Sequence, residues 1–182
     1  MNDSDSLFLK ALKKEILDVP PIWYMRQAGR YMPEYRNVRK NFKNFLDMCK
    51  NPEVCCDLAL QPINAFELDA AILFSDILTI PDALGLDVNF IEGEGPVFQN
   101  PIKSPSDINN LINFDPNDLN YVYEAVSNIK NSLPENIPLI GFCGSPWTLA
   151  AYSIEGRSSK DFKRTTEFIK SNKDETHFFF QD

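Results

Sequence analysis

The chain has 182 residues, 43% of them hydrophobic, and a net charge of −8. This length and composition suit one domain with a packed core. The negative charge argues against a general binder of nucleic acid or anionic membrane. No apolar run approaches the roughly 18 residues of a membrane span, and the first residues do not match a signal or transit peptide. We therefore expect a cytoplasmic protein that binds neither nucleic acid nor membrane.

The cysteines and the single histidine form no metal-ligand cluster. Cys49, Cys55, Cys56 and Cys143 contain no C-x-x-C pair, and His177 stands apart from them. A zinc site needs clustered ligands, so we expect no metal. Cys55 and Cys56 lie in an apolar, helix-like run, which favours reduced, buried thiols.

The first half of the chain alternates helical patterns with short apolar runs. Residues 5–16 carry apolar side chains at helical spacing and predict a helix. The run at 22–25 predicts a strand. The Asn-Pro-Glu sequence at 51–53 is a helix-start signal, and that helix should run towards Pro62. Residues 70–74 form a continuous apolar run, typical of a strand buried on both faces.

The second half continues the alternation. Residues 87–91 and the following Gly-Glu-Gly-Pro sequence predict a turn and a loop. Asp115-Pro116 opens a helix with an apolar face at spacings of three and four. Residues 137–143 form another candidate buried strand. Gly144-Ser145-Pro146 predicts the cap of a helix that runs to about Glu155, where Gly156 should stop it.

This alternation predicts βα units on a parallel sheet. Periodicity alone leaves open a doubly wound sheet or a (β/α)8 barrel. In both folds, functional residues lie at the C-terminal ends of strands. Arg26, Asp76 and the segment 141–152 fall at such ends.

Arg26, Arg30 and Asp76 are the charged candidates. Two guanidiniums four residues apart, with Gly29 between them to allow a close approach or an unusual turn, suit a receptor for carboxylates. The alternative is that the arginines form structural ion pairs. A carboxylate that ends an apolar strand is costly unless it meets donors. For Asp76 the alternative is the cap of a turn or helix.

Four segments carry a family resemblance. They are PIWYMRQAGRYMPEYR at 21–36, CKNPEVCCDLALQP at 49–62, FSDIL at 74–78 and GFCGSPWTLAAYSIEG at 141–156. Together they resemble the uroporphyrinogen decarboxylase family over residues 7–165, about the first half of a typical member. The resemblance implies an α/β fold, an incomplete N-terminal portion of a (β/α)8 TIM barrel. We expect residues 1–182 to be one domain, in which 166–182 form an atypical tail.

The resemblance also implies an activity and its residues. Members are cofactor-free carboxy-lyases that remove four acetate carboxyls from uroporphyrinogen III to give coproporphyrinogen III in haem biosynthesis, and the full-length form is a homodimer. Asp76 would accept hydrogen bonds from pyrrole N–H groups and stabilise positive charge on the ring, and Arg26 is the second catalytic candidate. A guanidinium is a poor acid near neutral pH, so proton donation by Arg26 is only a hypothesis. The implied substrate-binding residues are Arg26, Gln27, Ala28, Gly29, Arg30, Tyr35, Asp76 and Tyr152.

Two other functions stay open. The chain could be an inactive, truncated tetrapyrrole-binding fragment, or a relative of the corrinoid-dependent methyltransferases, which need a thiol-and-histidine zinc site. We expect Arg26, Arg30, Asp76 and Tyr152 to converge on one concavity. We also expect residues 1–182, expressed alone, to be inactive, since the opposite wall of the cleft would be missing.

Overall fold

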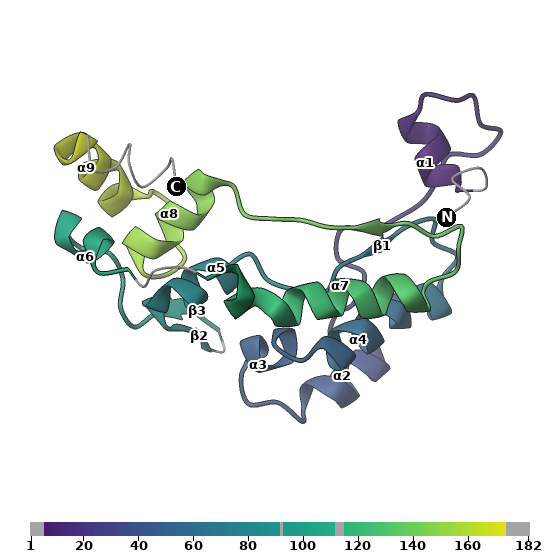
Figure 1. Cartoon of the computed structure of the whole chain (residues 1–182), viewed down its shortest axis with the longest axis horizontal. Coiled ribbons are helices and arrows are strands. Elements are labelled where there is room, and N and C mark those ends of the chain that lie inside the picture. Colours follow the sequence, from purple (N-terminus) through teal and green to yellow (C-terminus); the bar gives the residue numbers. More distant parts are fainter. Residues whose placement is uncertain (1–5, 92, 112–114, 174–182) are drawn as a thin grey trace. The chain divides into compact units, whose positions relative to one another are not determined.

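The computed structural model describes residues 6–91, 93–111 and 115–173, and the chain divides into two compact units (Figure 1). The first unit comprises Met1–Ser75 and Asn120–Phe142, and the second comprises Asp76–Leu119 and Cys143–Asp182. None of the helices in the described ranges has the length and apolar character needed to cross a membrane.

A parallel strand pair is the centre of the first unit. Strand β1 (Ala71–Ile72) pairs with β4 (Leu139–Ile140). Beyond the two strands, Leu73 N donates to Ile140 O at 2.9 Å. The parallel pairing of the apolar runs at 70–74 and 137–143 is therefore confirmed, although the regular ladder is shorter than either run.

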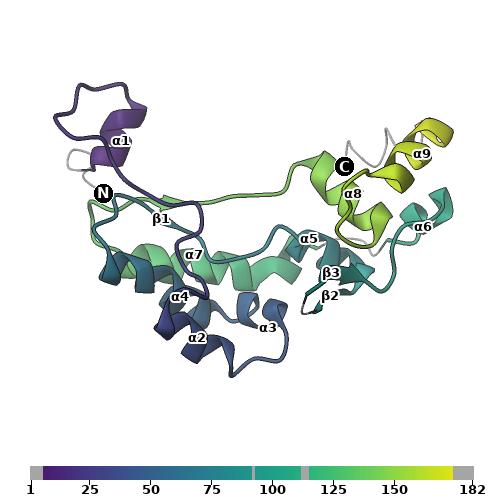
Figure 2. The same cartoon turned by 180° about the vertical axis from the view of Figure 1, so that it is seen from behind.

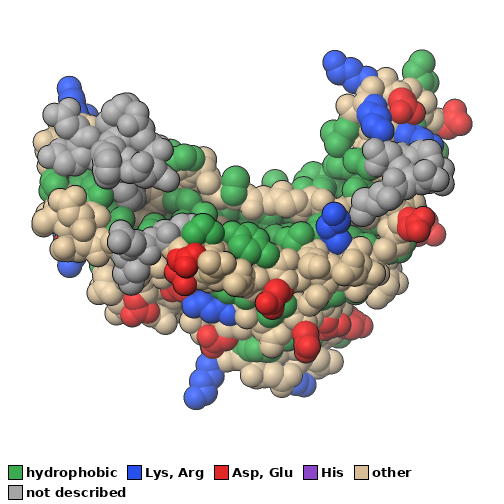
Figure 3. Space-filling view, in the orientation of Figure 1, with side chains coloured by type: hydrophobic (Ala, Val, Ile, Leu, Met, Phe, Trp, Pro, Cys, Tyr) green, Lys and Arg blue, Asp and Glu red, His purple; other side chains and the backbone are tan. Residues whose placement is uncertain are grey.

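The predicted strand at 22–25 is wrong. This segment touches the chain before β1 at one point, where Asp69 N donates to Ile22 O at 2.8 Å and Ile22 N donates to Asp69 Oδ2 at 2.7 Å. It forms no ladder with β1, because a side chain, that of Gln27, occupies the β1 backbone groups. Ile22 and Met25 are 50% and 74% exposed, and hydrophobic side chains are visible at the molecular surface (Figure 3).

The described part of the first unit contains five helices: α1 (Leu7–Leu12), α2 (Pro33–Arg39), α3 (Phe45–Cys49), α4 (Pro52–Ala65) and α7 (Asn120–Ser132). Helix α1 is shorter than the predicted 5–16, since Lys14 adopts a left-handed φ of 62° and Ile16 is fully exposed.

Helix α4 begins as predicted and ends later. The Asn51 side chain accepts a hydrogen bond from Val54 N at 3.1 Å, and Pro52 occupies the first turn. The helix continues through Pro62 to Ala65. A proline inside a helix loses one backbone hydrogen bond, and here the burial of Pro62 offsets that loss.

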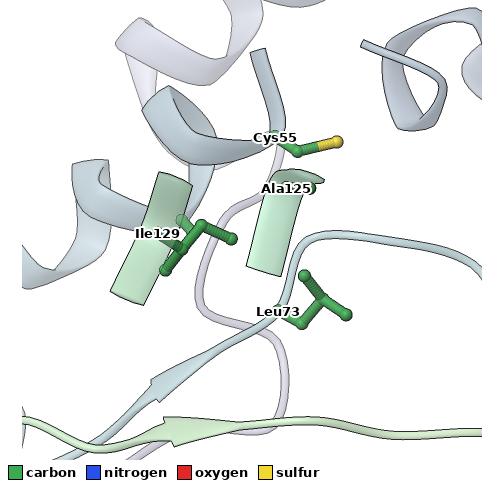
Figure 4. Close-up of a cluster of buried hydrophobic side chains, with 5 residues drawn as sticks. Cys55, Leu73, Ala125 and Ile129 are labelled. Atoms are coloured by element: carbon green, nitrogen blue, oxygen red, sulfur yellow. The ribbon is translucent and has the colours of Figure 1, made fainter. Parts of the chain in front are cut away.

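The core of the first unit lies between α4, α7 and the chain after β1. Figures 1 and 2 show both helices on one side of the β1–β4 pair. Buried side chains from all three segments meet in one cluster, whose members are Cys55, Ala59, Leu73, Ala125 and Ile129 (Figure 4). The apolar face predicted for the helix after Asp115 is therefore the face that α7 buries.

The second unit contains an antiparallel hairpin that the sequence did not predict. Strands β2 (Val88–Ile91) and β3 (Gly95–Phe98) pair with Val88 opposite Phe98. Gly93 and Gly95 take left-handed φ values of 85° and 87°, which turn the chain between and into the strands. The remaining elements are α5 (Thr79–Pro81), the π turn Asp82–Leu86, α6 (Pro105–Asn109), the 3-10 turn Pro116–Leu119, α8 (Pro146–Glu155) and α9 (Lys163–Ser171).

Helix α8 confirms its predicted bounds. The Ser145 side chain accepts from Thr148 N at 3.3 Å, and Pro146 is the first helical residue. Gly156 ends the helix with a φ of 76°, and a Cβ there would lie 3.0 Å from Pro101 Cβ. Left-handed backbone and close packing together favour glycine at this position.

Candidate functional site

The side chain of Gln27 connects the arginine-bearing segment to β1. It is 2% exposed. Its Nε2 donates to Ala70 O at 2.7 Å, and its Oε1 accepts from Ile72 N at 3.0 Å. A carboxamide has the donor and acceptor of a peptide group, so Gln27 pairs with β1 as a neighbouring strand would. We refer to these two hydrogen bonds as the Gln27 clasp.

Arg26 and Arg30 flank this clasp and are exposed. Within the described residues, neither guanidinium has a hydrogen bond or an ion pair, so the ion-pair alternative finds no partner there. The backbone after them is held by Arg36, whose Nη1 donates to Arg30 O at 2.8 Å and to Tyr31 O at 3.2 Å. The Tyr31 hydroxyl donates to Gln27 O. The arginine side chains therefore project from a fixed backbone.

Gly29 does not adopt the unusual backbone we expected. It is absent from the left-handed glycines, and a Cβ there would meet only the Tyr31 ring, at 3.4 Å. The turn is closed by an ordinary bond from Met32 N to Gly29 O at 2.9 Å. Ala28 is half-buried and packs against the cluster that includes Met32.

Tyr35 lies in α2 and is buried, with its ring 6.2 Å from that of Phe74. Burial raises the pKa of its phenol, and the positive charges of Arg39 and Arg30 act in the opposite direction. Both guanidiniums therefore act electrostatically on the phenol. Arg39 was not among the predicted site residues, although its place in the basic run 26–43 could have indicated it.

Asp76 lies in the second unit, directly after the apolar run. Its Oδ1 accepts from Leu78 N at 2.8 Å, and its backbone oxygen accepts from Thr79 Oγ1 at 3.0 Å. Burial raises the pKa of this carboxyl, and the Leu78 hydrogen bond opposes that shift. The predicted turn cap is thus present, but it uses only one carboxylate oxygen. Oδ2 has no partner within the described part of the chain.

The Asp76 segment packs against the start of α8. A Cβ at Gly144 would lie 2.5 Å from Leu149 Cδ2 and 3.3 Å from Ile77 Cβ. Any larger residue at position 144 would force the Leu149 side chain to shift. Two of the resembling segments, 74–78 and 141–156, are therefore neighbours.

Tyr152 is half-buried on α8 and lines a cavity of about 200 Å³. Arg26, Gln27, Ala28, Gly29, Arg30 and Tyr35 belong to the first unit, whereas Asp76 and Tyr152 belong to the second. The convergence of all of them on one concavity stays a prediction. Among the described residues, no group of three His, Cys, Asp or Glu side chains could hold a metal ion.

The chain matches the family model described as uroporphyrinogen decarboxylase (URO-D) over residues 3–181. This range extends past residue 165, where we expected the resemblance to fade. The chain is 54% identical to a uroporphyrinogen decarboxylase of Francisella philomiragia over 177 residues, which are 96% of this chain and 51% of that protein. It is also 54% identical to one of Legionella pneumophila over 175 residues, 96% of this chain and 50% of that protein. The chain thus spans about half the length of these curated relatives.

A solved methyltransferase from Methanosarcina mazei has a similar structure. The TM-score is 0.70 at 21% identity, over 97% of this chain and 50% of that one. At this identity the likeness concerns the fold and not the activity. With the family match, it confirms the expected fold class, part of a (β/α)8 barrel.

Proposed function

Because the chain belongs to the uroporphyrinogen decarboxylase family, we propose that the protein removes the four acetate carboxyls of uroporphyrinogen III without a cofactor and yields coproporphyrinogen III. The observation that carries this proposal is the half-buried carboxyl of Asp76, which has one oxygen fixed and one oxygen uncommitted. The guanidiniums of Arg26 and Arg30, which have no partner in the described part of the chain, support it, since the substrate carries eight carboxylates.

The reaction needs a sink for the electron pair that the departing CO2 leaves behind. A pyrrole ring serves this purpose when it is protonated at a ring carbon. The resulting cation accepts the electron pair as the carbon–carbon bond breaks, and a second protonation gives the methyl group. Positive charge therefore develops on the ring in the transition state.

Asp76 suits the stabilisation of that charge. Its Oδ2 can accept hydrogen bonds from pyrrole N–H groups while Leu78 N holds Oδ1 in place. A carboxylate oriented before the reaction and partly removed from water stabilises a developing cation more strongly than a solvated one.

Arg26 and Arg30 suit the binding and orientation of the substrate. Each guanidinium can hold a carboxylate through two parallel hydrogen bonds. Their backbone is fixed by the Gln27 clasp and by Arg36, and this reduces the entropy lost when the substrate is positioned. We assign both arginines to binding, and the proton donor stays a hypothesis.

The test is Asp76→Asn in the protein of natural length. The asparagine oxygen can still accept from Leu78 N, so the change removes the charge and keeps the cap. We expect kcat to fall about 10²- to 10³-fold, measured as coproporphyrinogen formed under anaerobic, reducing conditions. The control is Asp118→Asn, an exposed residue that should leave the rate unchanged. A wild-type rate for Asp76→Asn would contradict the role of the charge.

The pH dependence gives a second measurement on the same residue. Burial raises the pKa of Asp76 above the ordinary 3.8. Activity that needs the ionised carboxylate is lost as the pH falls through that raised pKa. The acid limb of kcat/KM should therefore lie above pH 3.8 and vanish in Asp76→Asn.

The homodimer and the cytoplasmic location expected from the family resemblance remain predictions. Size measurement of the natural-length protein tests the first of these. No observation favours the methyltransferase alternative, because the similarity to the Methanosarcina mazei protein concerns the fold alone.

A further inference from the structure

A small cavity lies between α8 and the segment that follows it. It has a volume of about 200 Å³ and combines aromatic walls with hydroxyls and one cation. Tyr152 and Trp147 line it from α8, and Arg157, Ser158 and Phe162 line it from the following segment. Among the residues that the structure describes, no carboxylate lines this cavity. Pockets that enclose a whole drug-sized ligand measure roughly 300–1,000 Å³, so this one suits a substituent and not a macrocycle.

The backbone that carries Arg157 is fixed by the hairpin. Val97 of β3 forms an antiparallel bridge with Arg157, and Phe98 N donates to Gly156 O at 2.9 Å. Gly95 lies close enough that a Cβ there would be 3.5 Å from Ser158 Oγ. The β2–β3 hairpin therefore holds Arg157 and Ser158 beside α8.

The side chain of Arg157 is exposed and uncommitted. Within the described residues, its guanidinium has neither a hydrogen bond nor an ion pair. The hydroxyls of Tyr152 and Ser158 likewise have no hydrogen-bond partner there. By contrast, Ser159 is already occupied, since its hydroxyl donates to Asp161 Oδ1 at 3.1 Å and accepts from Phe162 N at 3.1 Å.

Within the described residues, the donors of Arg157, Tyr152 and Ser158 thus have no acceptor. A guanidinium and two hydroxyls, placed against apolar walls in a cavity that no described carboxylate lines, match the carboxylate end of a short aliphatic chain. Arg157 and Ser158 also line a second hollow, together with Arg164 and Glu155. The Glu155 carboxylate makes that hollow less suitable for an anion than the cavity.

We propose that Arg157, together with Tyr152 and Ser158, forms a subsite for one carboxylate side chain of the tetrapyrrole substrate. This inference rests on the proposed function and extends it, since neither Arg157 nor Ser158 was among the expected site residues. The subsite fixes the orientation of the macrocycle from the α8 side, and Arg157 acts in binding and not in bond cleavage.

The experiment compares Arg157→Ala, Arg157→Lys and the control Lys160→Ala in the protein of natural length. Lys160 is an exposed cation three residues away that lines neither hollow. Three quantities are measured. Kinetics give KM and kcat for uroporphyrinogen, and a fluorescence titration gives the dissociation constant of uroporphyrin, the stable oxidised octacarboxylate.

We expect Arg157→Ala to raise both KM and the dissociation constant about tenfold, with kcat almost unchanged. Arg157→Lys should be intermediate, because lysine keeps the charge and loses the bidentate fork. The difference in dissociation constant between Arg157→Ala and the wild type should become smaller as salt is added. The KM and dissociation constant of Lys160→Ala should equal those of the wild type.

Equal affinity of Arg157→Ala and the wild type, or an equal loss in Lys160→Ala, would overturn the subsite. A wild-type protein that binds uroporphyrin but does not convert uroporphyrinogen would refute the proposed function instead. In that case the titration still decides the role of Arg157.

Discussion

Replacement of Gln27 by methionine tests whether the clasp fixes the arginine segment. Methionine has a similar length and volume but can make neither of the two hydrogen bonds. The change leaves Ala70 O and Ile72 N without their partner. Ala70 is completely buried, so water cannot readily replace the lost contact.

The size of the effect follows from these two groups. A buried polar group without a partner costs about 1–3 kcal/mol. The loss of free energy should be close to the full value at Ala70 O. It should be smaller at Ile72 N, which belongs to a half-buried residue. We therefore expect a loss of about 3 kcal/mol for local opening, which corresponds to roughly hundredfold faster hydrogen exchange at Ile72.

The assay is amide hydrogen exchange, read by mass spectrometry on peptides that cover 70–74. The matched control is Gln61→Met in α4. Gln61 Oε1 is buried and has no partner among the described residues, and Gln61 Nε2 donates one hydrogen bond to Asp57 Oδ2 at 3.0 Å. Because Gln61→Met removes an acceptor that has no described partner, it should change the free energy of local opening at 70–74 by less than about 1 kcal/mol.

The comparison between the two glutamines decides the interpretation. If Gln27→Met exchanges at 70–74 as slowly as Gln61→Met, the clasp does not stabilise β1. If β1 is loosened but uroporphyrin affinity is unchanged, the clasp holds the strand without positioning Arg26 and Arg30.

Two further predictions concern Arg30 and the cysteines. Arg30→Ala should weaken uroporphyrin binding about tenfold at low salt, and the loss should diminish as salt screens the charge; unchanged affinity in a fluorescence titration would make Arg30 structural. Burial raises the pKa of Cys55 to about 12, so its thiolate is almost absent at pH 8. Iodoacetamide should therefore label the exposed Cys143 in the folded protein and Cys55 only after denaturation, and equal labelling rates by mass spectrometry would contradict the burial.

The sequence predicts best the elements whose signals are local. Helix α8 has a capping serine, a proline at its first position and a terminal glycine, and all three act within one turn of the residue concerned. The start of α4 at Asn51 was predictable for the same reason. The parallel pairing of β1 and β4 was predictable because long apolar runs between helices indicate a sheet covered by helices.

The wrong strand prediction at 22–25 depends on groups that lie far away in the sequence. An apolar run such as 22–25 reads as a strand whether or not a neighbouring strand can accept it. Here the backbone groups of β1 are taken by a side chain 43 and 45 residues away, and periodicity cannot show that. The β2–β3 hairpin was missed for a different reason. The Gly-Glu-Gly-Pro sequence predicts a loop, but glycines between two short apolar segments also indicate a hairpin.

Asp76 shows why a structural and a functional interpretation of one residue need not compete. From the sequence, a cap and a charge that faces the substrate were alternatives. In the structure, the cap consumes one oxygen and so fixes the direction of the other. The same placement removes the carboxyl partly from water, which raises its pKa and strengthens its interaction with any cation that forms nearby. The hydrogen bond of the cap therefore orients the charged oxygen that we propose faces the substrate. Asp76→Asn separates these two roles, because asparagine can keep the hydrogen bond to Leu78 N but carries no charge.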